Sequence, residues 1–241
     1  MALRHHPDSV QSWGDSRGFG LLIDSVLSLV VAPSDRGMGL GTSLLESASL
    51  PSPVEAWSHG SHPGAAALGA RFGFTHDRSL WKMARSADAP TIGAWQVPDG
   101  VSLRGYRDTD AEALLRVNAA AFSFHPEQGE MDADDLAQRV AEPWFDPDGL
   151  LLAVSQTGDL LGFHWTKEHS DTEGEVYVIG VAPHAQGGGL GRTLLLAGLD
   201  HLTARGRTSV HLYVEANNAP AIALYGSFGF KPVETHAHYS R

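Results

Sequence analysis

From residue 101 to the last residue, short apolar runs alternate with longer segments in which apolar residues recur every three or four positions. The short runs predict strands at 101–103, 150–155, 160–165, 175–181 and 210–214, with a last strand starting at Phe230. The longer segments predict helices opened by the capping-box sequence Thr109-x-x-Glu112, at 190–205 before Gly206, and from Asn218 to about Ser227. This alternation is typical of an α/β fold.

A repeat divides the chain. Segment 31–41 returns as 181–191, offset by 150 residues, and Phe72-Gly73-Phe74 returns as Phe228-Gly229-Phe230, offset by 156. Two landmarks in the same order indicate a duplicated domain. Residues 86–100 are rich in Pro, Gly and small residues. We therefore predict an incomplete N-terminal copy at 1–88, a linker at 89–98 and a complete copy at 99–241.

The first copy looks short at its front. Its strand matching 175–181 is predicted at 22–31, only some twenty residues into the chain. We therefore expect this copy to lack the helix and the early strands that precede the equivalent strand in the second copy. Its sheet should then have an exposed or borrowed edge.

Composition narrows the classes of function. The 241 residues carry a net charge of −11, which disfavours a protein that follows nucleic-acid phosphates. Apolar runs stay shorter than the roughly 18 residues of a membrane span. The first residues also lack the charged-then-apolar order of a secretory signal peptide. We expect a cytoplasmic monomer with no nucleic-acid or membrane partner. The absence of cysteine excludes disulfides, thiolate metal ligands and a cysteine nucleophile.

The glycine-rich turn at 186–191 is the strongest chemical signal. It links a predicted strand to a predicted helix, so backbone N–H groups at the helix start can bind a phosphate. Arg192 stands where the dinucleotide fingerprint needs its third glycine, and the P-loop lysine is missing. The remaining pattern is Gln-x-x-Gly-x-Gly, and the first copy has the same pattern with Arg36 in place of the glutamine. The alternative to a phosphate-binding turn is a glycine-rich connection that binds no ligand.

This turn resembles the acetyl-CoA pyrophosphate loop of the GNAT acyltransferases. The downstream pattern Asn-x-x-Ala-x-x-Leu-Tyr-x-x-x-Gly-Phe is also similar and is filled by Asn218, Ala221, Leu224, Tyr225, Gly229 and Phe230. The resemblance covers most of 101–241. It implies a tandem GNAT fold, an α/β fold with a mixed central sheet flanked by helices, with acetyl-CoA as co-substrate and no metal.

Further segments resemble one tandem GNAT family, the mycothiol synthases. They lie at 120–129, 144–147, 162–167, 174–181 and 212–215, and in the first copy at 57–60 and 80–83. That family acetylates the cysteinyl amine of desacetylmycothiol, the last step in making an actinobacterial thiol. The resemblance implies this small-molecule thiol precursor and acetyl-CoA as partners.

Two residues are candidates for the chemistry. Glu175 is expected to project on the same strand face as Tyr177 and Ile179, and it matches the family's general base, which removes the amine proton. Tyr225 matches the tyrosine that GNAT enzymes hold near the CoA sulfur, and a phenol can protonate the leaving thiolate. The alternatives are a solvated carboxylate and a core-edge aromatic residue. Gly69 stands opposite Tyr225 in the first copy, so that copy is expected to bind acetyl-CoA without catalysing transfer.

The resemblance also implies the binding residues. The Val181 N–H is expected to polarise the thioester carbonyl, and Gly180 could permit a bulge. Lys167, Tyr213 and Glu127 are expected, with Glu175, to contact the acceptor. Acetyl-CoA contacts are expected at Ile179, Gly180, Val181, Gln186, Gly187, Gly188, Gly189, Leu190, Gly191, Arg192, Asn218, Ala219, Pro220, Ala221, Ile222 and Ala223, and in the first copy at Leu29, Val30, Val31, Arg36, Gly37, Met38, Gly39, Leu40 and Gly41.

Thirteen histidines raise the question of a metal. The tightest groups, His59-x-x-His62 and His236-x-His238, have no carboxylate or third histidine at a ligand-like interval, so no metal site is expected. Two other functions stay open. The chain could acetylate another small amine or a peptide N-terminus, or it could be a non-catalytic acyl-CoA-binding remnant.

Overall fold

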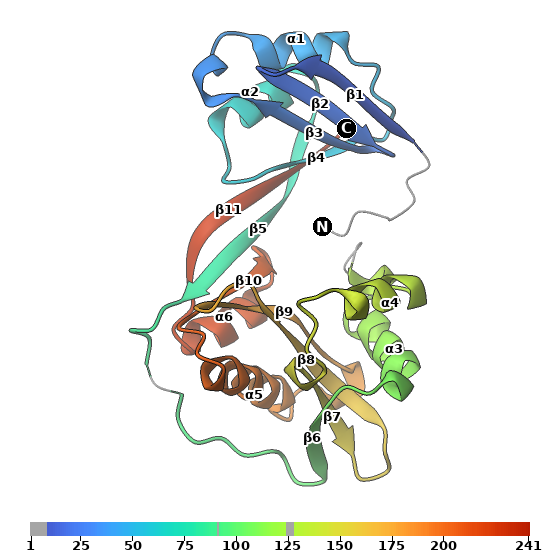
Figure 1. The fold of residues 1–241 in the computed structure, drawn as a ribbon, viewed down its shortest axis with the longest axis vertical. Coiled ribbons are helices and arrows are strands. Elements are labelled where there is room, and N and C mark those ends of the chain that lie inside the picture. Colours follow the sequence, from blue (N-terminus) through green and yellow to red (C-terminus); the bar gives the residue numbers. More distant parts are fainter. Residues whose placement is uncertain (1–8, 91, 124–127) are drawn as a thin grey trace. The chain divides into compact units, whose positions relative to one another are not determined.

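A computed structural model describes residues 9–90, 92–123 and 128–241 (Figure 1). The chain forms two compact units, and each is built from separate segments of the sequence. The N-terminal unit contains the described residues up to Lys82 together with 214–219 and 232–241. The C-terminal unit contains the described residues of 83–213 and 220–231. The predicted boundaries at 1–88, 89–98 and 99–241 did not include this exchange and stay a prediction.

The C-terminal unit is built on a mixed sheet with the strand order β10-β9-β8-β7-β6. The strands are β6 (Val101–Gly105), β7 (Leu150–Ser155), β8 (Leu160–Glu168), β9 (Glu173–Val181) and β10 (Ser209–Glu215). Neighbours from β6 to β9 are antiparallel, whereas β10 runs parallel to β9. The mixed sheet confirms the predicted fold class.

Helices cover both faces of this sheet (Figure 1). α3 (Ala111–Ala121) and α4 (Ala133–Ala141) pack Leu114 and Leu136 against Phe163 and Trp165. α5 (Leu190–Ala204) packs Leu194 on the other face, and α6 (Ala219–Ser227) precedes the last strand. Short 3-10 turns lie at Pro33–Asp35, Asp108–Asp110, Gln128–Glu130, Pro147–Gly149 and Pro183–Ala185. Helix α4 is not among the helices that the apolar spacing predicts.

The predicted capping box at Thr109 is wrong. A 3-10 turn, Asp108–Asp110, comes first, and α3 starts at Ala111 with Asp110 as its N-cap residue. The Asp110 carboxylate accepts the Arg107 N–H at 2.8 Å and is held by the Arg104 guanidinium at 2.6 and 2.7 Å. This pairing makes Asp110 the acidic residue that orders the entry to the helix.

A β-bulge changes which face β9 shows. Trp165 and Thr166 of β8 pair with Val178 and Val176, so Tyr177 is the extra residue of β9. The bulge is therefore at Tyr177. The sequence suggests Gly180 as a residue that could permit one, and no register shift occurs there. Tyr177 packs with the α3–α4 core, as predicted for the face of Glu175, but Ile179 packs with the α5 core. The expectation that Ile179 shares that face is wrong because the bulge shifts the alternation by one residue.

The N-terminal unit repeats the same strand order in a smaller form. β1 (Val10–Asp15), β2 (Gly18–Ile23) and β3 (Val26–Val31) are antiparallel, and β4 (Glu55–Ser58) runs parallel to β3. α1 (Leu40–Ser47), α2 (Pro63–Arg71) and β5 (Thr75–Arg85) complete the first copy. Its core contains Leu22, Leu27, Leu45 and Val54.

The expectation that the first copy lacks the early strands is wrong, because β1 and β2 precede β3. Segment 22–31 is not one strand, because Asp24 adopts a φ of 53° and turns the chain between paired Ile23 and Val26. β1 and β2 therefore precede β3 just as β7 and β8 precede β9. Three elements of the C-terminal unit, β6, α3 and α4, have no counterpart among the described residues of the N-terminal unit.

The N-terminal sheet takes a strand from the end of the chain, but in its interior and not at the exposed or borrowed edge that the sequence predicts. β11 (Lys231–Ser240) lies in the N-terminal sheet between β4 and β5, where Ala237 pairs with Ser58 and Ser240 with Glu55. β1 forms the edge of the sheet, and its residues are mostly exposed. The last strand of the second copy thus completes the sheet of the first.

The predicted linker packs on its own unit. The Trp95 Nε1–H donates to Asp200 of α5 at 2.5 Å, and Thr193 donates to the Gln96 carbonyl at 3.4 Å. This segment therefore lies against α5. No helix of the described residues is long and apolar enough to cross a membrane.

His164 predicts a pH dependence of stability. The side chain is fully buried against Gly198 of α5, Nδ1 lies 2.7 Å from the Leu194 carbonyl, and burial lowers the pKa of His164 to about 4. Its contribution is complete above the ordinary pKa near 6.5 and is lost as pH falls toward 4, because only the unfolded chain then takes up the proton. We expect a loss of about 2 kcal/mol of unfolding free energy between pH 7 and 5. Urea unfolding at both pH values measures it.

His164→Asn is the matched variant, because an amide can still donate to the Leu194 carbonyl but does not titrate. It should unfold more easily at pH 7 and show a flatter pH dependence. An unchanged slope would mean that other groups cause the acid sensitivity.

Candidate functional site

The sheet register places Lys167, Glu175 and His211 in one row across three neighbouring strands. Lys167 of β8 pairs with Glu175 of β9, and Glu175 pairs with His211 of β10. Directly opposed residues on neighbouring strands project to the same face. Tyr213, two residues beyond His211, shares that face. Lys167, Glu175 and Tyr213 therefore lie on one face of three adjacent strands.

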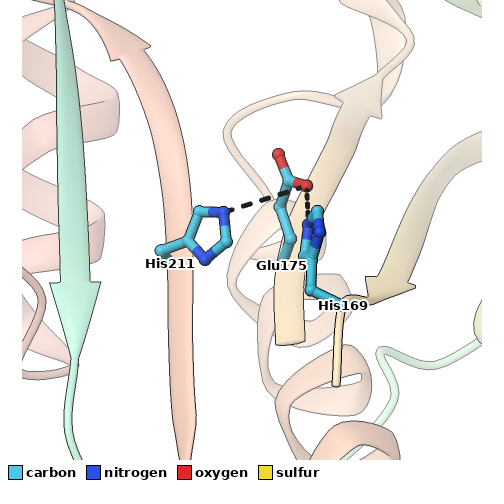
Figure 2. A group of neighbouring side chains, drawn as sticks. All are labelled: His169, Glu175 and His211. Carbon is cyan, nitrogen blue, oxygen red and sulfur yellow. Dashed lines mark hydrogen bonds and ion pairs between the residues drawn. The ribbon is translucent and has the colours of Figure 1, made fainter. Parts of the chain in front are cut away.

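Glu175 lies among histidines. Figure 2 shows His169 and His211 pointing toward its carboxylate from opposite sides. His169 Nε2 lies 2.6 Å from Glu175 Oε2, and His211 Nε2 lies 3.9 Å from the same oxygen. Glu175 is 7% exposed, so this carboxylate is a buried acceptor held by a direct hydrogen bond.

A second carboxylate lies beside His211. His211 Nδ1 is 3.1 Å from Glu173 Oε1, and Nε2 of the same ring is on the side of Glu175. The ligand atoms of His169, Glu175 and His211 lie within 4.8 Å of one another, a donor set that zinc accepts. Short intervals between histidines do not reveal this group, because His169 lies in the turn that precedes β9 and His211 reaches Glu175 through the β9–β10 register.

The histidine groups singled out in the sequence are separated in the structure. His62 caps α2 by accepting the Gly64 N–H, whereas His59 faces His236 at 3.2 Å. His238 lies between Asp77 at 2.6 Å and Glu55 at 3.2 Å. The other described donor group, Asp146, Glu168 and His201, has Arg205 and Arg207 bonded to its Glu168, which neutralises that carboxylate.

Lys167 borders the site on an aromatic surface. Its Nζ lies 4.3 Å from the centre of the Trp144 ring and 5.3 Å from that of Tyr177. Cation–π contacts of this kind fix an ammonium without neutralising it. Lys167 can therefore present a positive charge beside Glu175. Glu127, the other expected acceptor contact, lies outside the described residues.

Tyr225 does not belong to the row. It is buried in α6, its ring centre lies 6.0 Å from that of Phe230, and burial raises its pKa to about 12. The phenol therefore keeps its proton throughout the physiological range and can donate a hydrogen bond. Asn218 and Ala219–Ala223, which the resemblance assigns to acetyl-CoA, lie just before and in the first turns of the same helix.

The two glycine turns have the same local geometry. Gly187 and Gly189 have φ values of 84° and 82°, and Gly37 and Gly39 have 77° and 86°. In each turn the side chain before the first glycine donates to the last residue of the preceding strand. Gln186 donates to the Val181 carbonyl at 3.0 Å, and Arg36 donates to the Val31 carbonyl at 3.1 Å.

The start of α5 suits a diphosphate. No side chain of the described residues caps Gly189, and the first turn carries no acidic residue. A Cβ placed on Gly187, Gly188 or Gly189 would meet no atom of the described residues within 4 Å. The amides of this turn are therefore accessible to an anion. Arg192 adds a guanidinium nearby, stacked 4.6 Å from the Phe228 ring centre.

β9 and β10 are paired over only part of their length. Their ladder runs from Glu173–Ser209 to Val176–Leu212, while β9 continues beside β8 to Val181. Ile179, Gly180 and Val181 lie beyond the end of this ladder and lead into the glycine turn. This is where the resemblance expects the pantetheine arm.

The first copy has a different residue at the position of the candidate general acid Tyr225. Gly69 and Tyr225 each occupy the seventh position of a nine-residue helix, α2 and α6. A Cβ on Gly69 would lie 3.1 Å from the Tyr239 ring of β11, so that ring fills the space beside α2. The first copy keeps the geometry of the glycine turn but has no tyrosine at the position of Tyr225.

Replacing Gly189 tests the turn. Gly189→Ala should weaken acetyl-CoA binding about tenfold, since alanine strains a positive φ by about 1–2 kcal/mol and turns the amides away. Gly188→Ala is the matched control, because the site is equally open without a left-handed backbone. Gly39→Ala makes the same change in the first copy. Calorimetric titration with acetyl-CoA compares the three, and equal affinities would contradict a role for the Gly189 turn.

Comparison with known proteins agrees with this geometry. Residues 112–230 match the model of the acetyltransferase (GNAT) family. The chain is 53% identical over 263 aligned positions to the mycothiol acetyltransferase of Nocardioides sp. strain JS614, covering all of this chain and 89% of that protein. It is 47% identical to the mycothiol acetyltransferase of Actinosynnema mirum, covering 94% of this chain and 76% of that protein.

Solved structures support the fold. A GCN5-related N-acetyltransferase from Sphaerobacter thermophilus matches with a TM-score of 0.75 at 23% identity, over 93% of this chain and 80% of that one. A tandem GNAT protein from the clavulanic acid biosynthesis pathway matches with a TM-score of 0.70 at 19% identity, over 98% of this chain and 84% of that one. The duplicated architecture thus has precedent among solved structures.

Proposed function

Because the chain belongs to the mycothiol acetyltransferases of the GNAT family, we propose that it moves an acetyl group from acetyl-CoA to the cysteinyl amine of desacetylmycothiol. That acceptor is a cysteine joined through its carboxyl group to a glucosaminyl-inositol. The reaction is the last step in making mycothiol.

The observation that carries this proposal is the buried carboxylate of Glu175 in a row with Lys167 and His211. An amine acceptor arrives mainly as an ammonium ion and must lose a proton before it can attack. Glu175 can hold the ammonium and then accept that proton through one water. Lys167 and Tyr213 on the same face can bind the hydroxyls of the sugar and inositol.

The remaining groups supply the other half of the reaction. The turn at 186–191 binds the diphosphate of acetyl-CoA, and the Val181 N–H polarises the thioester carbonyl. The amine nitrogen forms a bond to the carbonyl carbon, and the carbon–sulfur bond breaks. Tyr225 gives its proton to the departing thiolate, and the proton that the nitrogen loses on becoming an amide replaces it on the phenol. Because the chain has no cysteine, an acyl-cysteine enzyme cannot form, and direct transfer is favoured.

An acceptor competition tests the proposal. The protein is incubated with acetyl-CoA and an equimolar mixture of desacetylmycothiol, an aminoglycoside and a short peptide, and the acetylated products are separated by mass. Desacetylmycothiol should be consumed first. Acetylation of the peptide terminus or the aminoglycoside instead would favour the alternative of another amine acceptor, and acetyl-CoA binding without any product would favour a non-catalytic remnant.

A further inference from the structure

Glu175 must return its proton to water in each cycle, yet its side chain is only 10% exposed. A buried general base therefore needs a partner that reaches solvent. His169 is placed to be that partner, since it contacts Glu175 at 2.6 Å and its own side chain is 34% exposed.

The position of His169 is fixed by the chain on both sides. It follows the end of β8, and its backbone N–H donates to the Glu173 carbonyl at 2.9 Å. Its ring centre lies 5.1 Å from that of His211. Figure 2 shows the His169 ring turned toward Glu175 from outside the strand pair β9–β10.

His169 also borders a surface pocket of about 310 Å³. Because this pocket lies at the surface, solvent in it can receive a proton that leaves the ring. The charged groups that surround His169 are Glu175 and His211 on the side of the site, and Asp146, Glu168, Asp171, Arg205 and Arg207 around the pocket. Arg205 and Arg207 are bonded to Glu168, so these two cations are partly neutralised.

We propose that His169 is a positioning residue that takes the substrate's proton from Glu175 and releases it to water in this pocket, an inference that rests on the proposed function. The ammonium proton first passes to the Glu175 carboxylate and leaves a neutral amine. At rest the ring carries its proton on Nε2 and donates it to the carboxylate. Once the carboxyl group is protonated, exchange with water moves the ring to its Nδ1–H tautomer, and the carboxyl proton passes to the vacated Nε2. This step restores the carboxylate and makes an imidazolium, which gives its Nδ1 proton to water and so returns to the starting tautomer. Histidine is the side chain that ordinarily exchanges protons near neutral pH.

Chemical rescue distinguishes this relay from a structural contact. His169→Ala should lower kcat about 10- to 100-fold with little change in KM for acetyl-CoA. Free imidazole should restore kcat of this variant in proportion to its concentration and leave the wild type unchanged. His169→Gln keeps a donor for Glu175 but cannot relay a proton, so its kcat should also fall. Full activity of His169→Gln, or no rescue of His169→Ala, would overturn the relay.

Two further experiments separate the relay from a metal site and from a contact that does not form in solution. A wild-type enzyme that loses activity with a chelator and regains it with zinc would show that His169, Glu175 and His211 act as metal ligands, which would overturn the relay. Nitrogen-15 spectra of the histidine rings need no turnover: Glu175→Gln should shift the His169 resonances and leave those of exposed His184 in place. Unmoved His169 resonances would overturn the contact itself, whereas absent wild-type turnover would count against the proposed function.

Discussion

Glu175→Gln should lower kcat for desacetylmycothiol by about 10²- to 10⁴-fold. Glutamine has nearly the same shape and can still bond to His169, so the fold and the row across β8, β9 and β10 should persist. It cannot accept a proton, however, and the ammonium form of the acceptor then stays unreactive. Because an amine loses its proton unaided as pH rises, the residual rate should increase with pH more steeply than in the wild type. Steady-state release of free CoA across a pH series measures this.

Glu112→Gln is the control for this change. Glu112 is an exposed residue of α3 paired with Arg116, so the same loss of one carboxylate should leave kcat unchanged. A wild-type rate in Glu175→Gln would remove the general base from the mechanism. A low rate combined with a loss of folded protein would instead point to the buried network with His169 and His211.

Tyr225→Phe should lower kcat by about 10²-fold or more, while KM for acetyl-CoA changes little. Phenylalanine keeps the ring that packs beside Phe230 in α6, so the loss reports on the hydroxyl alone. Replacing the CoA thiol by a better leaving group, such as an activated acetyl thioester, should shrink the difference between the two enzymes. Initial rates with both acetyl donors measure the effect.

The pKa of Tyr225 sets a second expectation. Burial raises it to about 12, so the phenol keeps its proton as pH rises through the range in which enzymes are assayed. The rate of the wild type should therefore not fall between about pH 7 and 10 through loss of the Tyr225 proton. Tyr106→Phe is the matched control, since Tyr106 is another buried tyrosine whose pKa burial raises, and it packs in the α3–α4 core. A rate loss in Tyr106→Phe equal to that in Tyr225→Phe would contradict the assignment.

Local patterns predicted much of the C-terminal unit. β7 matches its predicted bounds, and α5 ends one residue before the predicted 205. These elements depend on short apolar runs, helical spacing and glycine stops, all of which act within a few residues. The apolar spacing does not predict α4, because Leu136 and Val140 are its only large apolar residues and its capping residue Asp132 pairs with Asp135, not with a Glu or Gln.

The sequence predicts only some residues of the site, because the others come together through tertiary structure. Lys167, Glu175 and Tyr213 are predicted by resemblance, whereas His169 joins them from the turn between β8 and β9, and His211 joins them through the β9–β10 register. Register depends on long-range pairing, and the bulge at Tyr177 adds a shift that alternation along one strand cannot reveal. The exchange of β11 is another long-range choice, and no feature of residues 231–240 alone specifies β4 as their partner.

The place of β11 sets an order for biosynthesis. A ribosome releases residues 55–58 long before residues 237–240, yet these segments are neighbours in one sheet. The half of the protein made first is thus finished last, and it must wait with an open strand edge while the whole of 83–213 is translated and folds. A stop codon placed before Lys231 would deprive the early half, not the late one, of its central strand.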